Sequence, residues 1–190
     1  PFYVFDRPNP IGGIIQGPIL KDEYKSFVGM HPIPIRHGMT IGELAYMINE
    51  MGWLGDNLKV DLNIIKMQGW SRSMYFEETG LKWVPPSPNI ADVNTSIIYS
   101  GMCLIEGTNL SEGRGTDFPF LQFGAPWLDS ETLFNNMSNM NLPGVEFLKV
   151  SFIPRFIPSK ATYPKFINQE CKGLKILIDD RSKINPILIT

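Results

Sequence analysis

The sequence has few residues of the types that bind metals, and these are not spaced as a metal site requires. It contains two cysteines, Cys103 and Cys171, and two histidines, with no paired-ligand spacing among them. Glycine-rich signatures for dinucleotides or triphosphates are also missing. We therefore expect no metal and no cofactor. The cysteines are either buried apolar residues or the two halves of a disulfide between distant segments.

The charge balance and the apolar runs exclude two further classes of protein. With 17 basic and 19 acidic residues, the net charge is −2 and the pI is near 5.7, whereas nucleic-acid binding needs a basic surface. No apolar run approaches the roughly 20 residues of a membrane span. The hydrophobic content of 43% suffices for one domain or somewhat more. Because the chain starts at Pro1 without a signal-peptide pattern, we expect a fragment or a matured product.

The first segment of the chain predicts a strand that leads into a rigid loop. Phe2–Phe5 is a short apolar run, and Asp6-Arg-Pro-Asn-Pro10 follows it. Two prolines forbid a helix or a central strand there. Asp6, Arg7 and Asn9 therefore lie just past the carboxyl end of a strand, the edge at which open α/β sheets bind ligands. Residues 14–39 are expected to be irregular.

A helix and a second strand complete this part of the chain. Thr40 and Glu43 form a capping box, and apolar residues recur after them at helical spacing. Residues 58–64 alternate between apolar and polar, which is typical of a strand. Residues 1–84 are therefore expected to be the closing part of an α/β domain. The proline-dense segment 83–89 marks its end.

Residues 85–190 predict a second domain of mixed α+β type. The apolar run 97–105 reads as a strand, and a helix is expected from Asp129 or Ser130 to about Met140. Two further strands are expected at 145–152 and 174–178.

The densest group of polar residues is Glu106-Gly-Thr-Asn-Leu-Ser-Glu-Gly-Arg-Gly-Thr116, hereafter the polar loop. It holds two carboxylates, one guanidinium and three glycines in eleven positions. This glycine density favours a structured loop over a helix or a strand. Loops of this kind carry binding and catalysis more often than packing.

Several motifs, taken in order, resemble one known family, the bacterial exo-β-N-acetylmuramidases. Members of that family remove terminal N-acetylmuramic acid from peptidoglycan fragments. The motifs are Asp6-Arg-Pro-Asn-Pro10, Pro32-Ile-Pro-Ile-Arg-His-Gly-Met-Thr40, Gly42-Glu-Leu-Ala45, Trp70-Ser-Arg72, Thr79-Gly-Leu81, Trp83-Val-Pro-Pro-Ser-Pro-Asn89, Cys103 to Thr116, and Gly124-Ala-Pro-Trp127.

The resemblance implies the fold, the location and the partners of the protein. It implies the C-terminal part of a Rossmann-like domain, then a smaller ancillary domain, with the active site in the cleft between them. It also implies a missing N-terminal part, whose Pro-Glu-His-Gly motif holds a candidate catalytic acid. The implied substrate is a peptidoglycan-derived saccharide, and the implied location is exported, periplasmic or extracellular.

Glycoside hydrolysis needs an acid, and also a base, a nucleophile or a neighbouring group at the anomeric carbon. The candidates here are Glu106, Glu112 and His37, with Asp6, Glu43 and Asp117 as the other candidate carboxylates. The two glutamates flank a glycine-rich turn and suit a shared pocket. Alternatively, one of them pairs with Arg114 and makes the loop rigid. His37 suits acid–base work or a hydrogen bond to the sugar, with a half-buried structural histidine as the alternative.

The arginines suit the lactyl carboxylate that distinguishes muramic acid from glucosamine. A guanidinium binds a carboxylate through two hydrogen bonds, which lysine cannot do. Arg114 is the first candidate, followed by Arg36 and Arg72, with structural ion pairs as the alternative. The other expected substrate contacts are Asp6, Arg7, Asn9, Asn89, Thr108 and Asn109. For Asp6 and the asparagines, bonds that stabilise turns are the alternative.

Three functions therefore compete. The first is an N-acetylmuramidase, and the second is a non-catalytic module that binds muropeptides or sugars. The third is a remnant α/β domain that recognises a phosphate or a nucleotide, for which Gly113-Arg-Gly-Thr116 alone is a weak signal.

Overall fold

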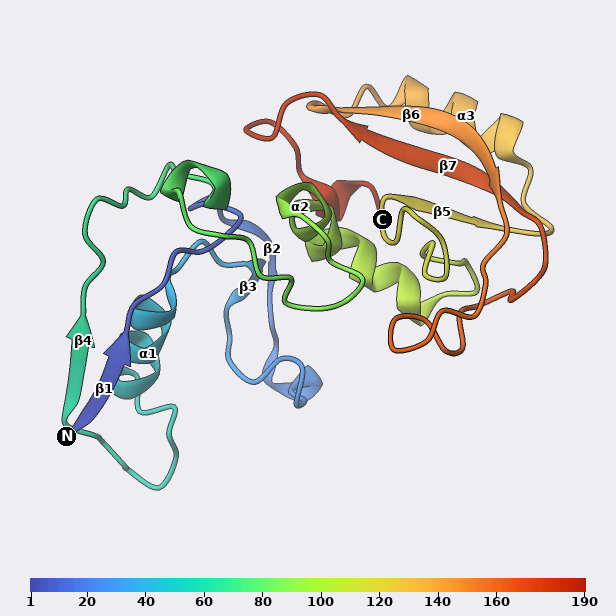
Figure 1. The fold of residues 1–190 in the computed structure, drawn as a ribbon. Coiled ribbons are helices and arrows are strands. Elements are labelled where there is room, and N and C mark those ends of the chain that lie inside the picture. Colours follow the sequence, from blue (N-terminus) through green and yellow to red (C-terminus); the bar gives the residue numbers. More distant parts are fainter. The chain divides into compact units, whose positions relative to one another are not determined.

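The computed structural model describes residues 1–190, which fold as two units, Pro1–Trp83 and Val84–Thr190. Figure 1 shows the ribbon of each unit, coloured along the sequence. No helix in either unit combines the length and the apolar character that crossing a bilayer takes.

The first unit is built around two parallel strands joined by a helix. β1 (Phe2–Phe5) pairs with β4 (Leu62–Ile65) in register from Phe2↔Leu62 to Phe5↔Ile65. The connection includes α1 (Ile41–Glu50), which contacts both strands (Figure 1). The predicted order of strand, loop, helix and strand is confirmed. β4 begins later than expected, because the backbone of Val60 bonds to the Asn49 side chain of α1 and not to β1.

A shared cap locks the end of β1 to the start of α1. The Thr40 hydroxyl accepts from the Glu43 backbone N–H, and a Glu43 carboxylate oxygen accepts from the Thr40 N–H, as the capping box predicts. Asp6 adds a second carboxylate, whose oxygens accept from the Gly42 N–H at 2.8 Å and the Thr40 hydroxyl at 3.0 Å. Gly42 has no room for a side chain, because a Cβ would meet Ile64 at 2.8 Å.

Two short strands occupy part of the segment that the sequence predicts as irregular. β2 (Gln16–Ile19) and β3 (Pro34–Arg36) pair antiparallel, with a register shift between them, and a 3-10 turn at Asp22–Tyr24 lies in the connection. The prediction was wrong because prolines at 18 and 34 argued against strands. In a two-stranded pair each strand is an edge, where proline is tolerated.

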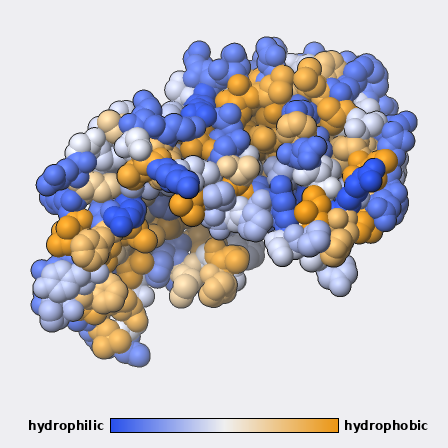
Figure 2. All heavy atoms as spheres, viewed as in Figure 1, coloured by the Kyte–Doolittle hydropathy of each residue, from blue (hydrophilic) through white to orange (hydrophobic).

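One face of the β1–β4 pair carries uncovered apolar side chains. Residues paired in parallel register point to the same side, and Ile64 faces α1. Tyr3, Phe5 and Ile65 therefore point away from α1, and all three are exposed. Figure 2 shows apolar atoms at the surface over this region.

The second unit contains a three-stranded antiparallel sheet in the order β5-β7-β6. The strands are β5 (Gln122–Ala125), β6 (Val145–Phe152) and β7 (Cys171–Ile178). α3 (Ser130–Asn139), capped by Asp129, packs on β6 and β7. The predicted helix and the two predicted strands are confirmed, and β5 was missed because it is short and contains Gly124. Both cysteines are free, and Cys171 is fully buried.

The apolar run 97–105 forms helix and not strand, so that prediction was wrong. α2 (Val93–Met102) begins at Asp92, whose carboxylate accepts from the Thr95 N–H at 2.7 Å, and a 3-10 turn, Cys103–Gly107, continues it. Most residues of this helix are buried, so it has no broad exposed polar face that would mark it as a helix in the sequence. A short apolar run of this kind cannot be assigned from periodicity, and the Asp92 cap was the missed signal.

Gly101 brings α2 against the C-terminal segment. A Cβ at this position would lie 2.1 Å from the Pro186 carbonyl oxygen, in the 3-10 turn Pro186–Leu188. The obstacle is backbone, which cannot rotate away. Ile97, Ile98 and Ile184, all fully buried, lie in the core of this unit.

We expect the Gly101→Ala variant to be less stable than the wild type by about 2 kcal/mol or more, since the added methyl group forces two backbones apart. Gly107→Ala is the matched control, because nothing lies within 4 Å of its Cβ position. Alanine favours helix over glycine, so this control should be neutral or slightly stabilising. Chemical denaturation of the full-length protein checks both, and equal stability of the two variants would contradict the expected packing.

Candidate functional site

The polar loop is fastened to β5 by backbone hydrogen bonds. Ser111 and Gly124 exchange N–H···O bonds of 2.8 and 3.0 Å, and the Phe120 N–H donates to the Glu112 carbonyl at 2.7 Å. Gly113 has φ +78°, and a Cβ there would meet the Gln122 carbonyl oxygen at 2.6 Å. The loop is therefore a fixed structure, as the sequence predicts, although it follows a helix and not a strand.

Glu112 is the buried centre of this loop. Its side chain is 0% exposed, and one carboxylate oxygen accepts from Arg114 Nε at 2.8 Å. The other oxygen lies 3.6 Å from Lys165 Nζ and has no closer hydrogen-bond partner. A carboxylate can be buried at tolerable cost only where cations offset its charge. The geometry thus corresponds to the alternative in which a glutamate pairs with Arg114 and makes the loop rigid.

Lys165 holds the first half of the loop from a distant part of the sequence. Its ammonium group lies 2.8–3.1 Å from the carbonyl oxygens of Ile105, Glu106, Thr108 and Leu110. These carbonyls point inward toward one charge, which curls the chain around it. Sequence reasoning missed Lys165, because nothing local in the sequence links it to the loop.

Glu106 and Arg114 present the accessible charges of the loop. Arg114 Nη2 lies 3.6 Å from a Glu106 carboxylate oxygen, and the two side chains are 37% and 36% exposed. The Glu112 hydrogen bond is the largest cause that raises the pKa of Arg114, with a smaller contribution from Glu106. Arg114 Nη1 has no hydrogen-bond partner in the structure. The guanidinium is thus held on one edge and retains donors for a ligand.

Tyr99 joins this group and was also missed. Positions 99, 103 and 106 follow the spacing of one helix face. Burial raises the pKa of the Tyr99 phenol, with smaller contributions from Cys103 and Glu106. Its ring packs edge-on against Phe120, with ring centroids 4.8 Å apart. Reading the segment as a strand hid this spacing, because alternate residues of a strand face opposite sides.

Three other predicted residues of the second unit differ in what they contact. Asn109 is exposed and its side chain has no partner, so it is open to a ligand. The Thr108 hydroxyl donates to the Ile105 carbonyl and accepts from the Leu110 N–H, which closes a turn. Asn89 is buried and donates to the Lys160 carbonyl at 2.7 Å, so it supports the fold.

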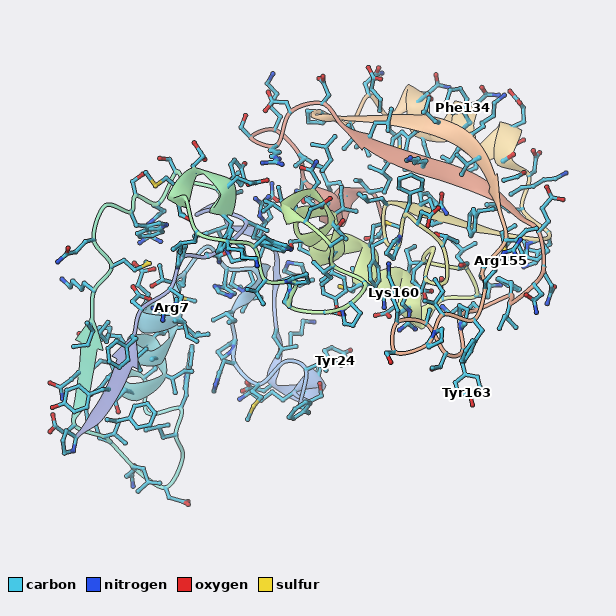
Figure 3. All side chains as sticks on the ribbon, viewed as in Figure 1. Arg7, Tyr24, Phe134, Arg155, Lys160 and Tyr163 are labelled. Carbon is cyan, nitrogen blue, oxygen red and sulfur yellow. The ribbon has the colours of Figure 1, made fainter.

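The first unit has a cavity at the carboxyl ends of β1 and β4. Its volume is about 420 Å³, and Asp6, Arg7 and Trp70 line it together with residues 67–69. This is the sheet edge at which the sequence predicts ligand contacts. Arg7, labelled in Figure 3, is exposed and donates to its neighbour Asp6. The Asp6 carboxylate is already engaged in the cap of α1.

Asn9 and His37 make the bonds of structural residues. The Asn9 amide donates to the Met39 carbonyl at 3.0 Å and accepts from the Ile11 N–H at 3.2 Å. His37 Nδ1 accepts from the Met39 N–H at 3.1 Å, and burial lowers the pKa of His37. The histidine is therefore neutral near pH 7 and fixes a turn, the alternative that its sequence context left open.

Arg36 and Arg72 do not offer free guanidinium groups. Arg36 is 1% exposed and donates to the Gln16 side chain and to the Ile11 carbonyl at 2.8–2.9 Å. Arg72 forms a two-bond ion pair with Glu43 and also donates to the Gly38 carbonyl. The expectation that these arginines face a substrate carboxylate therefore finds no support in this geometry. Both hold segments of the first unit together.

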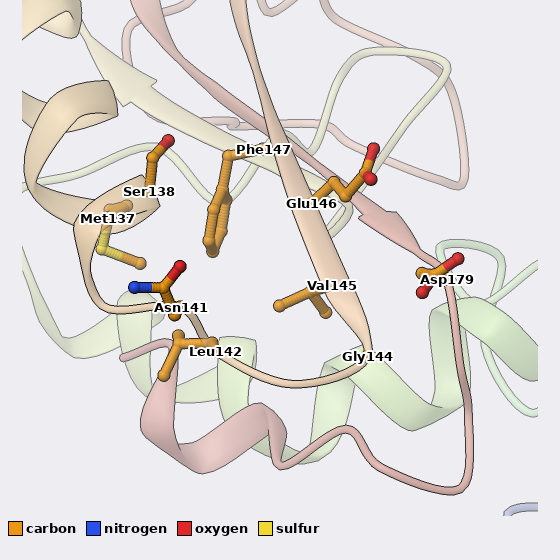
Figure 4. A pocket seen from close by; sticks show the side chains of 9 residues that line it. All are labelled: Met137, Ser138, Asn141, Leu142, Gly144, Val145, Glu146, Phe147 and Asp179. Carbon is orange, nitrogen blue, oxygen red and sulfur yellow. The ribbon is translucent and has the colours of Figure 1, made fainter.

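A separate cavity of about 450 Å³ lies near the ends of β6 and β7 (Figure 4). Figure 4 shows Phe147 and Glu146 on opposite sides of β6, with Asp179 on the side of Glu146. None of the predicted site residues lines this cavity. Nowhere in the chain do three or more histidines, cysteines or carboxylates gather as a metal would need.

Comparison with known proteins gives the same family along the whole chain. Residues 1–94 match the model described as exo-beta-N-acetylmuramidase NamZ, N-terminal, and residues 97–190 match its C-terminal counterpart. The chain is 45% identical over 188 residues to the peptidoglycan beta-N-acetylmuramidase NamZ of Bacillus subtilis (strain 168). That match covers 98% of this chain and 43% of the relative.

Two crystal structures of DUF1343 family proteins from Bacteroides fragilis NCTC 9343 share the fold. One is 35% identical to this chain with a TM-score of 0.89, and the match covers 99% of this chain and 47% of the Bacteroides chain. The other is 38% identical with a TM-score of 0.72, and the match covers 90% of this chain and 42% of the Bacteroides chain. The chain thus spans less than half the length of the proteins it matches. By its sequence matches and its fold, it belongs to the NamZ family of exo-β-N-acetylmuramidases.

Proposed function

We propose that the protein containing this chain is a glycoside hydrolase that releases terminal N-acetylmuramic acid from peptidoglycan fragments. Family membership supports this reaction, and the observation that carries it is the arrangement of Glu106, Arg114 and Glu112. A buried carboxylate holds one edge of a guanidinium whose other edge is open beside an accessible carboxylate. A sugar that bears a carboxylate is the ligand such a pair suits.

The three residues take different roles in this proposal. Arg114 binds the lactyl carboxylate through Nη1 and Nη2, neither of which makes a hydrogen bond in the structure. Glu106 is the carboxylate of the loop that reaches substrate, and its pairing with Arg114 suits a base or an orienting group, since a general acid must carry a proton. Glu112 is a positioning residue, because it is wholly buried. The acid is expected outside this chain, in the N-terminal part that the family resemblance implies.

We infer that the first unit is part of a Rossmann-like sheet. Two parallel strands with a helical crossover support this, and so does the uncovered apolar face, because parallel strands are normally buried on both sides. Ligand contacts at Arg7 and Trp70 fit the strand ends of such a sheet. The cleft between the two domains and the exported location stay predictions.

A non-catalytic module that binds muropeptides is the second candidate. The observation that favours it is the complete burial of Glu112, which leaves Glu106 as the one accessible carboxylate of the polar loop. A catalytic pair would then need a partner from elsewhere, such as the substrate's own acetamido group.

The full-length protein should release N-acetylmuramic acid from a disaccharide in which this sugar is linked to N-acetylglucosamine. Chromatography of the products measures the release over time. A folded sample that binds the disaccharide without cleaving it would favour the binding module. A folded sample that does neither would remove both.

Glu106→Gln and Glu112→Gln should separate chemistry from support. Glu106 is accessible, so its variant should lose most of kcat and keep the melting temperature. Glu112→Gln removes the buried counter-charge of Arg114 and Lys165, which should cost about 2 kcal/mol of stability. Thermal denaturation and initial rates check the pair. Equal melting temperatures for the two variants would contradict the assigned roles.

Arg114→Lys should weaken discrimination between substrates with and without the lactyl carboxylate. Lysine keeps the charge but loses the two-bond geometry, so kcat/KM for the muramyl substrate should fall about 30-fold, or roughly 2 kcal/mol. The rate on a glucosamine analogue should change little by comparison. Arg181→Lys is the matched control, since Arg181 lies outside the polar loop and donates to the Asn94 side chain. Unchanged discrimination in Arg114→Lys would rule out this contact.

A further inference from the structure

A cavity of about 430 Å³ lies where the end of the polar loop meets the segment that follows β6. Residues 115–118, Gln122, residues 151–153 and residues 155–157 line it. Its volume is in the range of pockets that hold small ligands. None of the residues assigned to the proposed glycosidase site lines it, so that site leaves the role of the cavity open.

The floor of this cavity is rigid. The Gly115 carbonyl accepts from the Arg155 N–H at 2.9 Å, and a Cβ on Gly115 would meet the Arg155 carbonyl oxygen at 2.5 Å. The Thr116 hydroxyl donates to the Gly113 carbonyl and accepts from the Gln122 side chain and the Phe118 N–H. A site fixed in this way loses little entropy when a ligand binds.

Two opposite charges line the cavity without pairing. Asp117 and Arg155 are both exposed, and neither side chain makes a hydrogen bond or an ion pair in the structure. Their charged atoms lie farther apart than the 4.0 Å of an ion pair. Arg155 is labelled in Figure 3, on the segment after β6. A carboxylate and a guanidinium that are separated in one hollow match a ligand with an ammonium group and a carboxylate.

Apolar side chains complete the lining. Phe118, Ile153 and Phe156 are all exposed at the cavity. Lys175 Nζ lies 3.2 Å from the centroid of the Phe118 ring, which holds the ring in place. Apolar surface between two charges suits the aliphatic chain of an amino acid. A neutral sugar would use neither charge.

We propose that this cavity binds a short peptide that carries a free ammonium group and a free carboxylate. Asp117 accepts from the ammonium group and Arg155 donates to the carboxylate. The peptide part of a peptidoglycan fragment has this chemistry, and that choice of source rests on the proposed function. The cavity would then recognise the peptide separately from the sugar.

The test is calorimetry of the full-length protein with N-acetyl-γ-D-glutamyl-L-lysine, which carries one ammonium group and free carboxylates. Arg155→Gln and Asp117→Asn should each raise Kd about two- to fivefold. In the wild type, amidating the peptide carboxylates should cost the same factor as Arg155→Gln. In Arg155→Gln, amidating the peptide should raise Kd no further. Acetylating the lysine amine should weaken binding to the wild type by the same factor as Asp117→Asn, and should not weaken binding to that variant.

Both residues are exposed, so the variants should keep the wild-type melting temperature. Arg155→Gln should also keep the wild-type rate on a peptide-free disaccharide. Absence of peptide binding to the wild type would overturn the proposal, as would an unchanged Kd in both variants. Peptide binding by a protein without glycosidase activity would keep this site and remove the proposed function instead.

Discussion

The buried charge of Glu112 is the constraint on which the polar loop depends. A carboxylate removed from water must be offset, and here Arg114 and Lys165 supply the two cations. Each cation then does a second task. Lys165 draws the carbonyls of residues 105–110 around its ammonium group, and Arg114 turns its outer edge toward Glu106. One ion pair thus fixes the backbone and aims the accessible side chains.

The first unit uses charge in the same way at the start of α1. Asp6 and Glu43 both accept from the helix N-terminus, where the peptide dipoles favour negative charge. Arg72 then binds Glu43 and ties a distant segment to this cap. Asp6 and Arg72, which the sequence predicts as ligand contacts, are here bonded to the start of α1 and so connect loop, strand and helix. This leaves Arg7 as the charged side chain of the cavity that remains free to meet a ligand.

Sequence reasoning succeeded where the signal was local. The capping box at Thr40, the Asp129 cap and the strand at residues 145–152 each depend on residues within a few positions of one another, and each was confirmed. It failed for α2, because a buried helix and a buried strand share one apolar pattern. The error then hid Tyr99, whose position near Glu106 follows only from helical spacing. Lys165 was beyond reach, since its carbonyl partners lie more than 50 residues away.

Residues that bind a ligand differ from residues that support the fold in having accessible hydrogen-bond donors or acceptors that the protein itself does not use. Arg72 and Asn9 direct their donors at the protein's own groups. Arg36 and Asn89 are buried, so the atoms that they leave unpaired are out of a ligand's reach. Glu106, Arg114 and Asn109 keep acceptors or donors that nothing in the structure uses. A polar group on the surface can satisfy itself with water, so exposure alone is uninformative. Exposure beside a rigid backbone differs, because the geometry is fixed before the ligand arrives and binding then costs less entropy. This criterion, applied across the second unit, selects the open edge of the polar loop and the cavity that Asp117 and Arg155 line.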